Sequence, residues 1–450
     1  MQITRQGLQQ EASATIRLAV PIIIGELAQM SLHIIDAAMV GALGYKQLAA
    51  VSLVLNSINI PFIFGIGLTI AVSQMVSMAN GRRDGRQVSH YLFNGFWLCT
   101  AVALLISVGI LVGINTLYHL GQDPEVVELA IPFGRMIALS LIPSLLFMTL
   151  KQFADGLEHT AIAMVLSLVC VPVNILLNWL LIYGHWGFPR LELIGAGWAT
   201  LITRTLIFFM LLFVVLYHHK FRRYMMVRRS QWKLSWKTQR ELLHIGVASS
   251  LQMGLEAGAF AVSGIIIGTM GAIPQAAHQI ALSMASLTFM VSIGLAQAGS
   301  IRVSNAYGRG DWHHINRIGR STLFTALVYG GICVIGITAF RFHLPYLFND
   351  NDQVVQMAAL LLLFAAIFQI SDSTQAVGAG LNRGIKDVKV PTLLVAIAYW
   401  VIGIPVGYLL AFHWGMGATG IWLGFIVGLS FASIFMFTRF LRSVKKKISH

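Results

Sequence analysis

Charged side chains are scarce in this chain of 450 residues: Asp, Glu, Lys and Arg make up 11% of it, whereas hydrophobic residues make up 57%. Soluble proteins usually contain about 25% charged residues, and the mean hydropathy here is +0.75. The composition therefore excludes a soluble globular protein. Since a membrane-spanning helix takes about 20 apolar residues, the length predicts about twelve spans joined by short loops.

Cysteine is scarce as well. Cys99, Cys170 and Cys333 lie inside apolar runs at no spacing typical of a metal site, so no disulfide framework is expected. The sequence also lacks the Gly-x-x-x-x-Gly-Lys-Ser/Thr nucleotide loop, the His-Glu-x-x-His metal helix and the Gly-x-Ser-x-Gly nucleophile turn. We therefore expect neither ATP hydrolysis by this chain nor an enzyme of any other kind.

Apolar runs between polar breaks predict twelve helices. Several exceed 25 residues, so we expect them to tilt or to protrude from the bilayer. The predicted spans are residues 14–40, 48–79, 90–115, 128–152, 160–184, 193–217, 240–268, 276–307, 315–340, 354–380, 391–414 and 417–441.

Positive charges are concentrated in alternate loops. All but five of the 31 Lys and Arg residues fall at the N-terminus, at the connections after even-numbered spans or at the C-terminus. Cytoplasmic loops of membrane proteins carry such an excess, so both termini are predicted to be cytoplasmic, and the net charge of +14 does not indicate a nucleic-acid partner. The exceptions are Lys46, Arg135, Arg190, Arg204 and Arg341.

The chain contains an internal duplication. Residues 41–84 align with residues 268–311 at a constant offset of 227, with 17 of 44 positions identical. Six spans per half make the repeats parallel, which is a transporter architecture. We predict an all-α polytopic membrane protein with twelve transmembrane helices in two six-helix lobes related by a pseudo-two-fold axis: a first lobe (1–217), a basic cytoplasmic linker interpreted as a solvated hinge (218–240), and a second lobe (241–450).

Acidic residues inside the predicted spans are few: Glu26, Asp36, Glu256 and Asp372. An ionisable group in hydrocarbon costs several kcal/mol and marks a functional site by default, although a buried ion pair that only joins helices is the alternative. Glu256 and Asp372 could meet near mid-membrane. There they cannot both ionise unless a cation lies between them or one takes a proton.

Polar residues of three spans are expected to converge in the first lobe. Their oxygens would suit a hard cation or a protonatable carboxylate; contacts that only hold helices together are the alternative. The residues are Glu26, Gln29, His33 and Asp36, which form one stripe on the first helix, Asn174 and Asn178 on one face of the fifth, and Thr200 on the sixth.

Four motifs follow one another along the chain: Pro21 through Asp36, Ala276-Ala277-His278-Gln279, Ser304-x-x-x-Gly308 and Gly380-x-x-Arg383-Gly384-x-x-Asp387. In this order they resemble the multidrug and toxic compound extrusion (MATE) transporters, in particular the NorM-like branch, over residues from about 14 to 440. The resemblance implies an antiporter of a prokaryotic inner membrane that exports cationic, often aromatic drugs in exchange for Na⁺ or H⁺, with no further cofactor. We expect it to act as a monomer in the lipid bilayer.

The resemblance also assigns residues. One position departs from the family: Phe368, one turn before Asp372, stands where NorM relatives often have Tyr. The Tyr hydroxyl that would belong to the expected Na⁺ shell is therefore absent. Matching the family's sites are Asp36, Asn174, Asn178 and Thr200 in the first lobe, Glu256 and Asp372 at a cation site in the second lobe with His278 as a neighbour, and Pro21 at the bend of the first helix.

Two intramembrane residues look unusual beside the family. Arg204 lies near the predicted bilayer centre, level with Glu26 on the first helix, so we predict a Glu26–Arg204 ion pair, with an Arg204 that snorkels alone as the alternative. His33, one turn from Asp36, could pass protons to that carboxylate, although an ordinary core histidine is the simpler interpretation.

Two other transport functions fit the same architecture. One is a flippase for lipid-linked precursors of a related fold, which would need a more cationic cavity to hold a pyrophosphate. The other is a drug exporter driven by H⁺ instead of Na⁺. The in-span charges are mostly acidic, which favours a cationic substrate. A channel is disfavoured, because buried carboxylates in unlike lobes suit alternating access better than an open ring.

Overall fold

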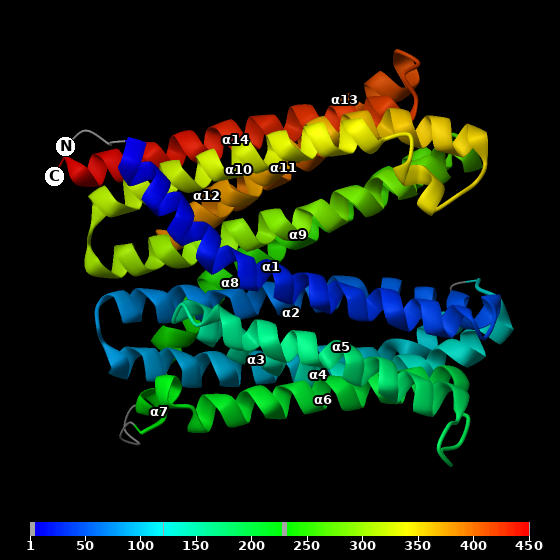
Figure 1. Ribbon diagram of the computed structural model, residues 1–450, viewed down its shortest axis with the longest axis horizontal. Coiled ribbons are helices and arrows are strands. Elements are labelled where there is room, and N and C mark those ends of the chain that lie inside the picture. Colours follow the sequence, from blue (N-terminus) through cyan, green and yellow to red (C-terminus); the bar gives the residue numbers. More distant parts are fainter. Residues whose placement is uncertain (1–4, 120, 227–231, 450) are drawn as a thin grey trace. The chain divides into compact units, whose positions relative to one another are not determined.

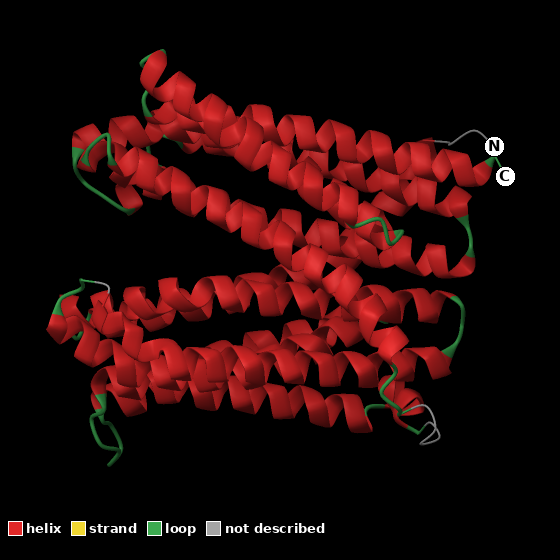
Figure 2. Ribbon diagram, turned by 180° about the vertical axis from the view of Figure 1, so that it is seen from behind, coloured by secondary structure: helices red, strands yellow, loops and turns green. Residues whose placement is uncertain are grey.

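The computed structural model describes residues 5–119, 121–226 and 232–449. Throughout these residues the regular secondary structure is helical, and none of it is strand (Figure 2). Twelve helical segments are long and apolar enough to cross a membrane. The predicted fold class, an all-α polytopic membrane protein, is therefore confirmed.

Eleven spans are built on single α-helices, and one is interrupted by π-helical turns. The single helices are α1 (Arg5–Gly41), α2 (Tyr45–Gly81), α3 (Gly85–Gly113), α4 (Pro124–Gly156), α5 (Thr160–Tyr183), α6 (Glu192–Tyr217), α8 (Trp236–Gly268), α9 (Ala272–Arg309), α10 (Trp312–Phe340), α11 (Asp352–Gly384) and α14 (Ala418–Ile448). The interrupted span comprises α12 (Lys389–Ala396), η4 (Ile397–Gly403), α13 (Ile404–Tyr408) and η5 (Leu409–His413), and the short helices are η1 (Ile114–His119), α7 (His219–Met225) and η3 (Leu344–Leu347).

The interrupted span differs from the regular helix predicted over 391–414, since η4 and η5 are π-helical. Pro405 has no N–H and cannot continue the α-helical bonding pattern. The backbone also passes very close to α14, where a Cβ on Gly424 would lie 2.4 Å from the carbonyl oxygen of Gly403. Local π-helical turns of this kind are frequent at functional sites.

The duplication is visible where helices begin. Gly44 precedes α2 with φ 154° and Gly271 precedes α9 with φ 126°, a region that favours glycine. Asp84 caps α3 and Asp311 caps α10, each accepting hydrogen bonds from backbone N–H groups two or three residues further on. Both pairs are separated by the offset of 227, so the repeated sequence encodes repeated caps.

The chain forms two compact units that do not coincide with the two halves of the sequence. One unit comprises Ile24–Ser250, and the other comprises Met1–Ile23 with Leu251–His450. The first part of α1 therefore packs with the second half of the chain, and the start of α1 lies at the same end of that unit as the end of α14 (Figure 1). The first part of α8 likewise packs with the first half.

Glycines admit these exchanged helices. A Cβ on Gly67 of α2 would lie 2.5 Å from the backbone of Ser250 in α8, and a Cβ on Gly294 of α9 would lie 2.3 Å from Ile23 Cγ1 in α1. Gly67 and Gly294 are equivalent in the repeat, and so are Ile23 and Ser250. Each unit thus receives the exchanged helix at the same point of the repeat.

The short helix α7 packs against α3 and α4 within the Ile24–Ser250 unit. Phe221 is completely buried, with its ring centroid 5.7 Å from that of Phe153 on α4. Tyr224 is buried beside it, and its carbonyl oxygen accepts a hydrogen bond of 2.6 Å from the Ser89 hydroxyl of α3. Two aromatic side chains therefore anchor a segment whose other side chains are mostly basic.

Asn94 of α3 holds the described residues that follow this segment. Asn94, completely buried, donates to the carbonyl oxygen of Lys233 at 3.1 Å and accepts from the backbone N–H of Ser235 at 3.0 Å. The described part of the predicted linker 218–240 is therefore docked on this unit instead of being solvated along its length. Residues 227–231 lie outside the described residues.

Candidate functional site

Asp36 lies where α1, α5 and α6 meet. Asn178 Nδ2 donates a hydrogen bond of 2.6 Å to Asp36 Oδ1, and Thr200 Oγ1 donates one of 3.2 Å to Asp36 Oδ2. Asn178 also donates to Asn174 Oδ1 at 3.1 Å. The structure thus brings together the four residues predicted for a first-lobe site.

Only neutral groups donate to the Asp36 carboxylate. Asn174 and Asn178 lie one turn apart on one face of α5. The single hydroxyl proton of Thr200 is shared between Asp36 and the Ala196 carbonyl oxygen, which lies 2.9 Å from Thr200 Oγ1. Within the described residues no Lys, Arg or His lies within ion-pair distance of Asp36. The negative charge is therefore solvated by amide and hydroxyl dipoles, and it can still attract a cation or a proton.

Two cavities beside Asp36 share His33, Asp36, Thr200 and Arg204 in their walls. His33 thus lies at the candidate site, although no hydrogen bond joins it to Asp36 within the described residues. One cavity is otherwise largely apolar and the other polar. The wall of the first cavity is completed by Val40, Val51, Leu55, Phe133, Ile137 and Ala196, and the wall of the second by Gln29, Leu32, Asn174 and Thr203.

The predicted Glu26–Arg204 ion pair is wrong. Arg204 Nη1 donates a hydrogen bond of 2.8 Å to Ser140 Oγ on α4, and its guanidinium lies 5.8 Å from the centroid of the Phe62 ring. Glu26 forms its ion pair with Lys151 of α4. Arg204 instead belongs to the cavity wall beside Asp36.

Lys151 was missed because α4 is longer than predicted. The predicted span 128–152 placed it at the cytoplasmic boundary, whereas α4 continues to Gly156 and buries Lys151 and Asp155 within the unit. The Lys151 ammonium interacts with both Glu26 and Asp155. The spacing of Lys151 and Asp155, four residues apart on one helical face, was the available signal.

The second candidate site lies in the unit that contains Leu251–His450. Glu256 of α8 and Asp372 of α11 are close enough to interact electrostatically, as predicted from their depths. Both also interact with Tyr399 of η4, which is completely buried. Asp372 Oδ1 is buried without a hydrogen-bond partner in the described chain. Two carboxylates and a phenol thus surround a place where a carboxylate oxygen lacks a described partner.

Tyr399 was also missed by the sequence analysis. It lies in η4, where the π-helical turns change the direction in which each side chain points relative to a regular helix. A period of 3.6 residues therefore gives the wrong face for this segment. The Tyr399 phenol lies near Asp372. It therefore offers a hydroxyl close to the carboxylate beside which Phe368 has none.

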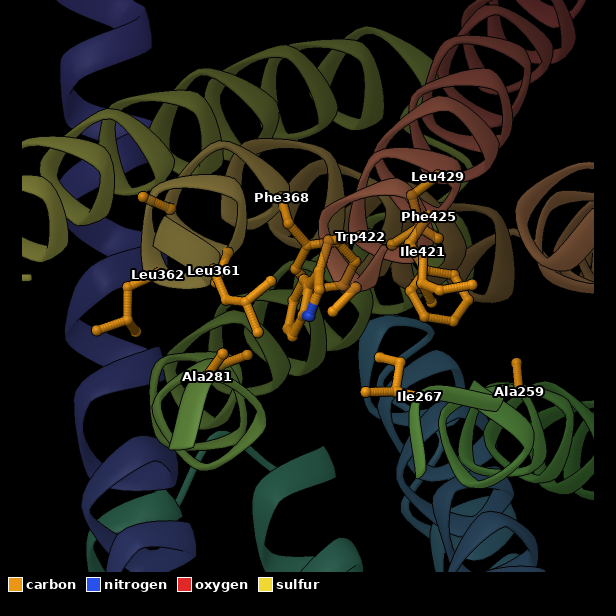
Figure 3. Packing of buried hydrophobic residues seen from close by; sticks show 14 of the residues in the cluster. Ala259, Ile267, Ala281, Leu361, Leu362, Phe368, Ile421, Trp422, Phe425 and Leu429 are labelled. Carbon is orange, nitrogen blue, oxygen red and sulfur yellow. The ribbon is translucent and has the colours of Figure 1, made fainter. Parts of the chain in front are cut away.

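His278 lies in the core of the same unit. Its Nδ1 accepts a hydrogen bond of 3.2 Å from Trp422 Nε1, so the neutral ring carries its proton on Nε2, an atom with no partner in the described residues. Trp422 also packs edge-on against Phe368, with ring centroids 5.5 Å apart (Figure 3). His278 is thus placed by aromatic packing, and none of its described bonds reaches Glu256 or Asp372.

The remaining predicted residue, Pro21, lies within α1, which continues as a helix on either side of it. No group of three or more His, Cys, Asp or Glu side chains in the described part of the chain is arranged to hold a metal. A Na⁺ ion beside Glu256 and Asp372 would therefore need hydroxyl, carbonyl or water oxygens as further ligands, and the Tyr399 phenol is one.

Parallel duplication, the twelve spans of the described residues and an acidic site within the spans of each unit define a membrane transporter. The MatE family model matches residues 21–180 and 248–409. The chain is 34% identical over 441 residues to "Probable multidrug resistance protein NorM" of Mesorhizobium japonicum, covering 96% of this chain and 94% of that one. The chain therefore belongs to the MATE family of transporters, as the resemblance indicated.

Other comparisons agree. The chain is 32% identical over 444 residues to "Multidrug resistance protein MdtK" of Yersinia pseudotuberculosis, covering 95% of each. The solved structure described as "Crystal structure of MATE in complex with MaL6" superposes with a TM-score of 0.89 at 20% identity, covering 99% of this chain and 100% of that one. The structural similarity extends through both repeats.

Proposed function

We propose that the protein is an antiporter that exports cationic, aromatic compounds in exchange for Na⁺ or H⁺ by alternating access across the plasma membrane, with both termini in the cytoplasm. The proposal is supported above all by the Asp36 carboxylate, which among the described residues receives hydrogen bonds from neutral donors and faces a cavity whose wall is largely apolar apart from His33, Thr200 and Arg204. The names of the curated relatives, which describe multidrug resistance proteins, support the same activity.

The proposed cycle couples the two ligands by competition. A proton or Na⁺ that binds Asp36 removes the charge that attracts a cationic compound, so each ligand weakens the binding of the other. Glu256 and Asp372 add a second acidic site in the other unit, where a cation between the carboxylates would relieve their repulsion. An electrical potential contributes about 2.3 kcal/mol per 100 mV for each net charge moved.

The composition of the second acidic site bears on the coupling ion. Glu256, Asp372 and Tyr399 supply carboxylate and phenol oxygens, which are hard ligands suited to Na⁺. The same phenol could instead share a proton with a carboxylate. Na⁺ is our first choice because of the NorM relationship, and H⁺ is the alternative that Phe368 and His33 favour.

The experiment is ethidium efflux from proteoliposomes under one gradient at a time. A Na⁺ gradient at constant pH that drives efflux would assign Na⁺ as the coupling ion, and efflux driven only by a pH gradient would assign H⁺. Movement under neither gradient would contradict the antiporter proposal. Transport of a lipid-linked pyrophosphate would then be measured, because Arg204 places one positive charge in the first-lobe cavity.

A further inference from the structure

Arg204 is a half-buried cation whose hydrogen-bonding capacity is largely unused within the described residues. A guanidinium has five N–H donors, and the described residues offer it one hydrogen bond, from Nη1 to Ser140 Oγ. No carboxylate of the described chain lies within ion-pair distance of it. Asp36, which lines the same cavities, interacts with Arg204 electrostatically but forms no direct ion pair with it. An Arg in the membrane interior is costly without a directly paired anion, so a ligand that supplies an anion would gain that interaction.

One negative and one positive side chain face the same two cavities without forming an ion pair. Among the described residues Asp36 is the only acidic side chain in either wall, and its Oδ1 and Oδ2 accept from Asn178 and Thr200 respectively. Arg204 is the only permanent cation there, and His33 is the only other titratable group. A negative and a positive group therefore line one space without touching, which is the pattern expected for binding a ligand that carries both charges.

The position of Arg204 is fixed in a way that suits recognition. Ser140 on α4 holds one arm of the guanidinium, and the ring of Phe62 on α2 lies beneath it. An anchored guanidinium presents its remaining donors as a planar fork, which matches a carboxylate in a bidentate fashion. Phe133 in the neighbouring wall adds an aromatic surface for a flat ligand.

We propose that Arg204 forms an anion subsite that binds the carboxylate of zwitterionic aromatic substrates, while Asp36 receives their cationic part. This inference rests on the proposed export function and specifies a substrate class for it. It also assigns a role to Ser140, which positions Arg204 without touching the substrate.

The test compares two dyes that differ in one group. Rhodamine 110 carries a free carboxylate, and rhodamine 123 is its methyl ester with the same cationic ring system. Binding of each to the full-length protein in nanodiscs is measured by fluorescence anisotropy. Arg204→Gln is expected to weaken rhodamine 110 binding at least 10-fold and to leave rhodamine 123 binding unchanged or tighter. Ser140→Ala should weaken rhodamine 110 binding less, by about 3-fold.

Equal weakening of both dyes by Arg204→Gln, or no change for either, would overturn the subsite, and so would a wild-type protein that fails to bind rhodamine 110. If Arg204→Gln aggregates, Arg204→Lys takes its place. Lys keeps the positive charge but lacks the planar fork, so Arg204→Lys is expected to weaken the binding of rhodamine 110 several-fold and to leave the binding of rhodamine 123 unchanged. Efflux of both dyes is measured in parallel. Selective binding without efflux would contradict the antiporter proposal and leave the subsite standing.

Discussion

At the scale of single residues, Asp36 is the group on which export is expected to depend most. Asp36→Asn removes the negative charge while keeping a side chain of the same size beside Asn178 and Thr200. We expect ethidium efflux to fall to the level of empty liposomes, with an unchanged elution profile on size exclusion. Glu192→Gln, a half-exposed acid of the same unit, serves as the control and should retain full efflux. Normal transport by Asp36→Asn would remove this residue from the mechanism.

The ion pair between Lys151 and Glu26 is expected to matter for stability. The Lys151 side chain is only 5% exposed, and removing one partner of a buried pair leaves an uncompensated charge that costs about 3–5 kcal/mol. Lys151→Met should therefore lower the melting temperature in detergent strongly, and Lys151→Met combined with Glu26→Gln should recover part of the loss.

The matched control for this prediction is the pair of Lys46 and Glu125, whose side chains are 35% and 65% exposed. Exposed pairs contribute about 0–1 kcal/mol, so Lys46→Met should change the melting temperature little. Equal effects of Lys46→Met and Lys151→Met on the melting temperature would show that breaking the buried Lys151–Glu26 pair costs no more stability than breaking an exposed one.

At the scale of elements, η4 places the Tyr399 hydroxyl beside Glu256 and Asp372, and we expect it to take the place of the hydroxyl that Phe368 lacks. Tyr399→Phe should weaken the response of efflux to the coupling ion about 10-fold, because it removes a phenol oxygen beside Glu256 and Asp372. Phe368→Tyr introduced into that variant should restore part of the response from α11. The measurement is the ion concentration for half-maximal efflux, and a Tyr399→Phe protein with the wild-type value would exclude the phenol from the ion site.

The docking of α7 is expected to depend on pH. His159 lies in the loop between α4 and α5, with its ring 5.6 Å from that of Phe221. Burial, with Lys220 and Arg223 nearby, lowers the pKa of His159 below its usual 6.5. The neutral ring is thus favoured when α7 is docked, so this contribution is complete above pH 6.5 and is lost as the pH falls towards the lowered pKa.

Hydrogen exchange of residues 219–225 measures this docking. After correction for intrinsic rates, exchange should be faster at pH 5.5 than at pH 7.5, and His159→Asn should abolish the difference. A difference that persists in His159→Asn would assign the effect to His218, whose pKa is also lowered, by slight burial and by His219 and Lys220.

The elements also show where prediction from sequence ends. Twelve spans and two repeats were predictable because hydropathy and the Gly and Asp caps repeat along the chain. The partner of Glu26 was not, since it required the end of α4 to be known within four residues. Tyr399 was not, because π-helical turns break the periodicity on which facial assignments depend. Asp36 with Asn178 and Thr200 was predictable from depth within regular helices.

At the scale of the whole molecule, the two units are joined by continuous helices. The unit boundaries fall after Ile23 in α1 and after Ser250 in α8, not in the basic segment between the halves. Hydropathy could not predict this, because it does not report which bundle a helix joins. Any rearrangement between the units must therefore be accommodated within α1 and α8.

This connectivity predicts the behaviour of a divided chain. Residues 1–231 lack the part of α8 that completes the Ile24–Ser250 unit, whereas residues 1–268 contain all of it. In a pulse-chase experiment fragment 1–231 should be degraded faster than fragment 1–268, and co-expression with residues 232–450 should stabilise it. Equal lifetimes of the two fragments would show that α8 is dispensable for this unit.

The exchanged helices also set an order of events during synthesis. Ile23 emerges early, yet the glycine against which it packs, Gly294, is made 271 residues later. At 5–20 residues per second the first part of α1 waits roughly 15–50 s for its site. During that interval its packing face is uncovered in the membrane, and an insertase or chaperone that shields nascent helices would bind there. The Ile24–Ser250 unit waits as well, because it is completed only when the first part of α8, in the second half of the chain, has been made.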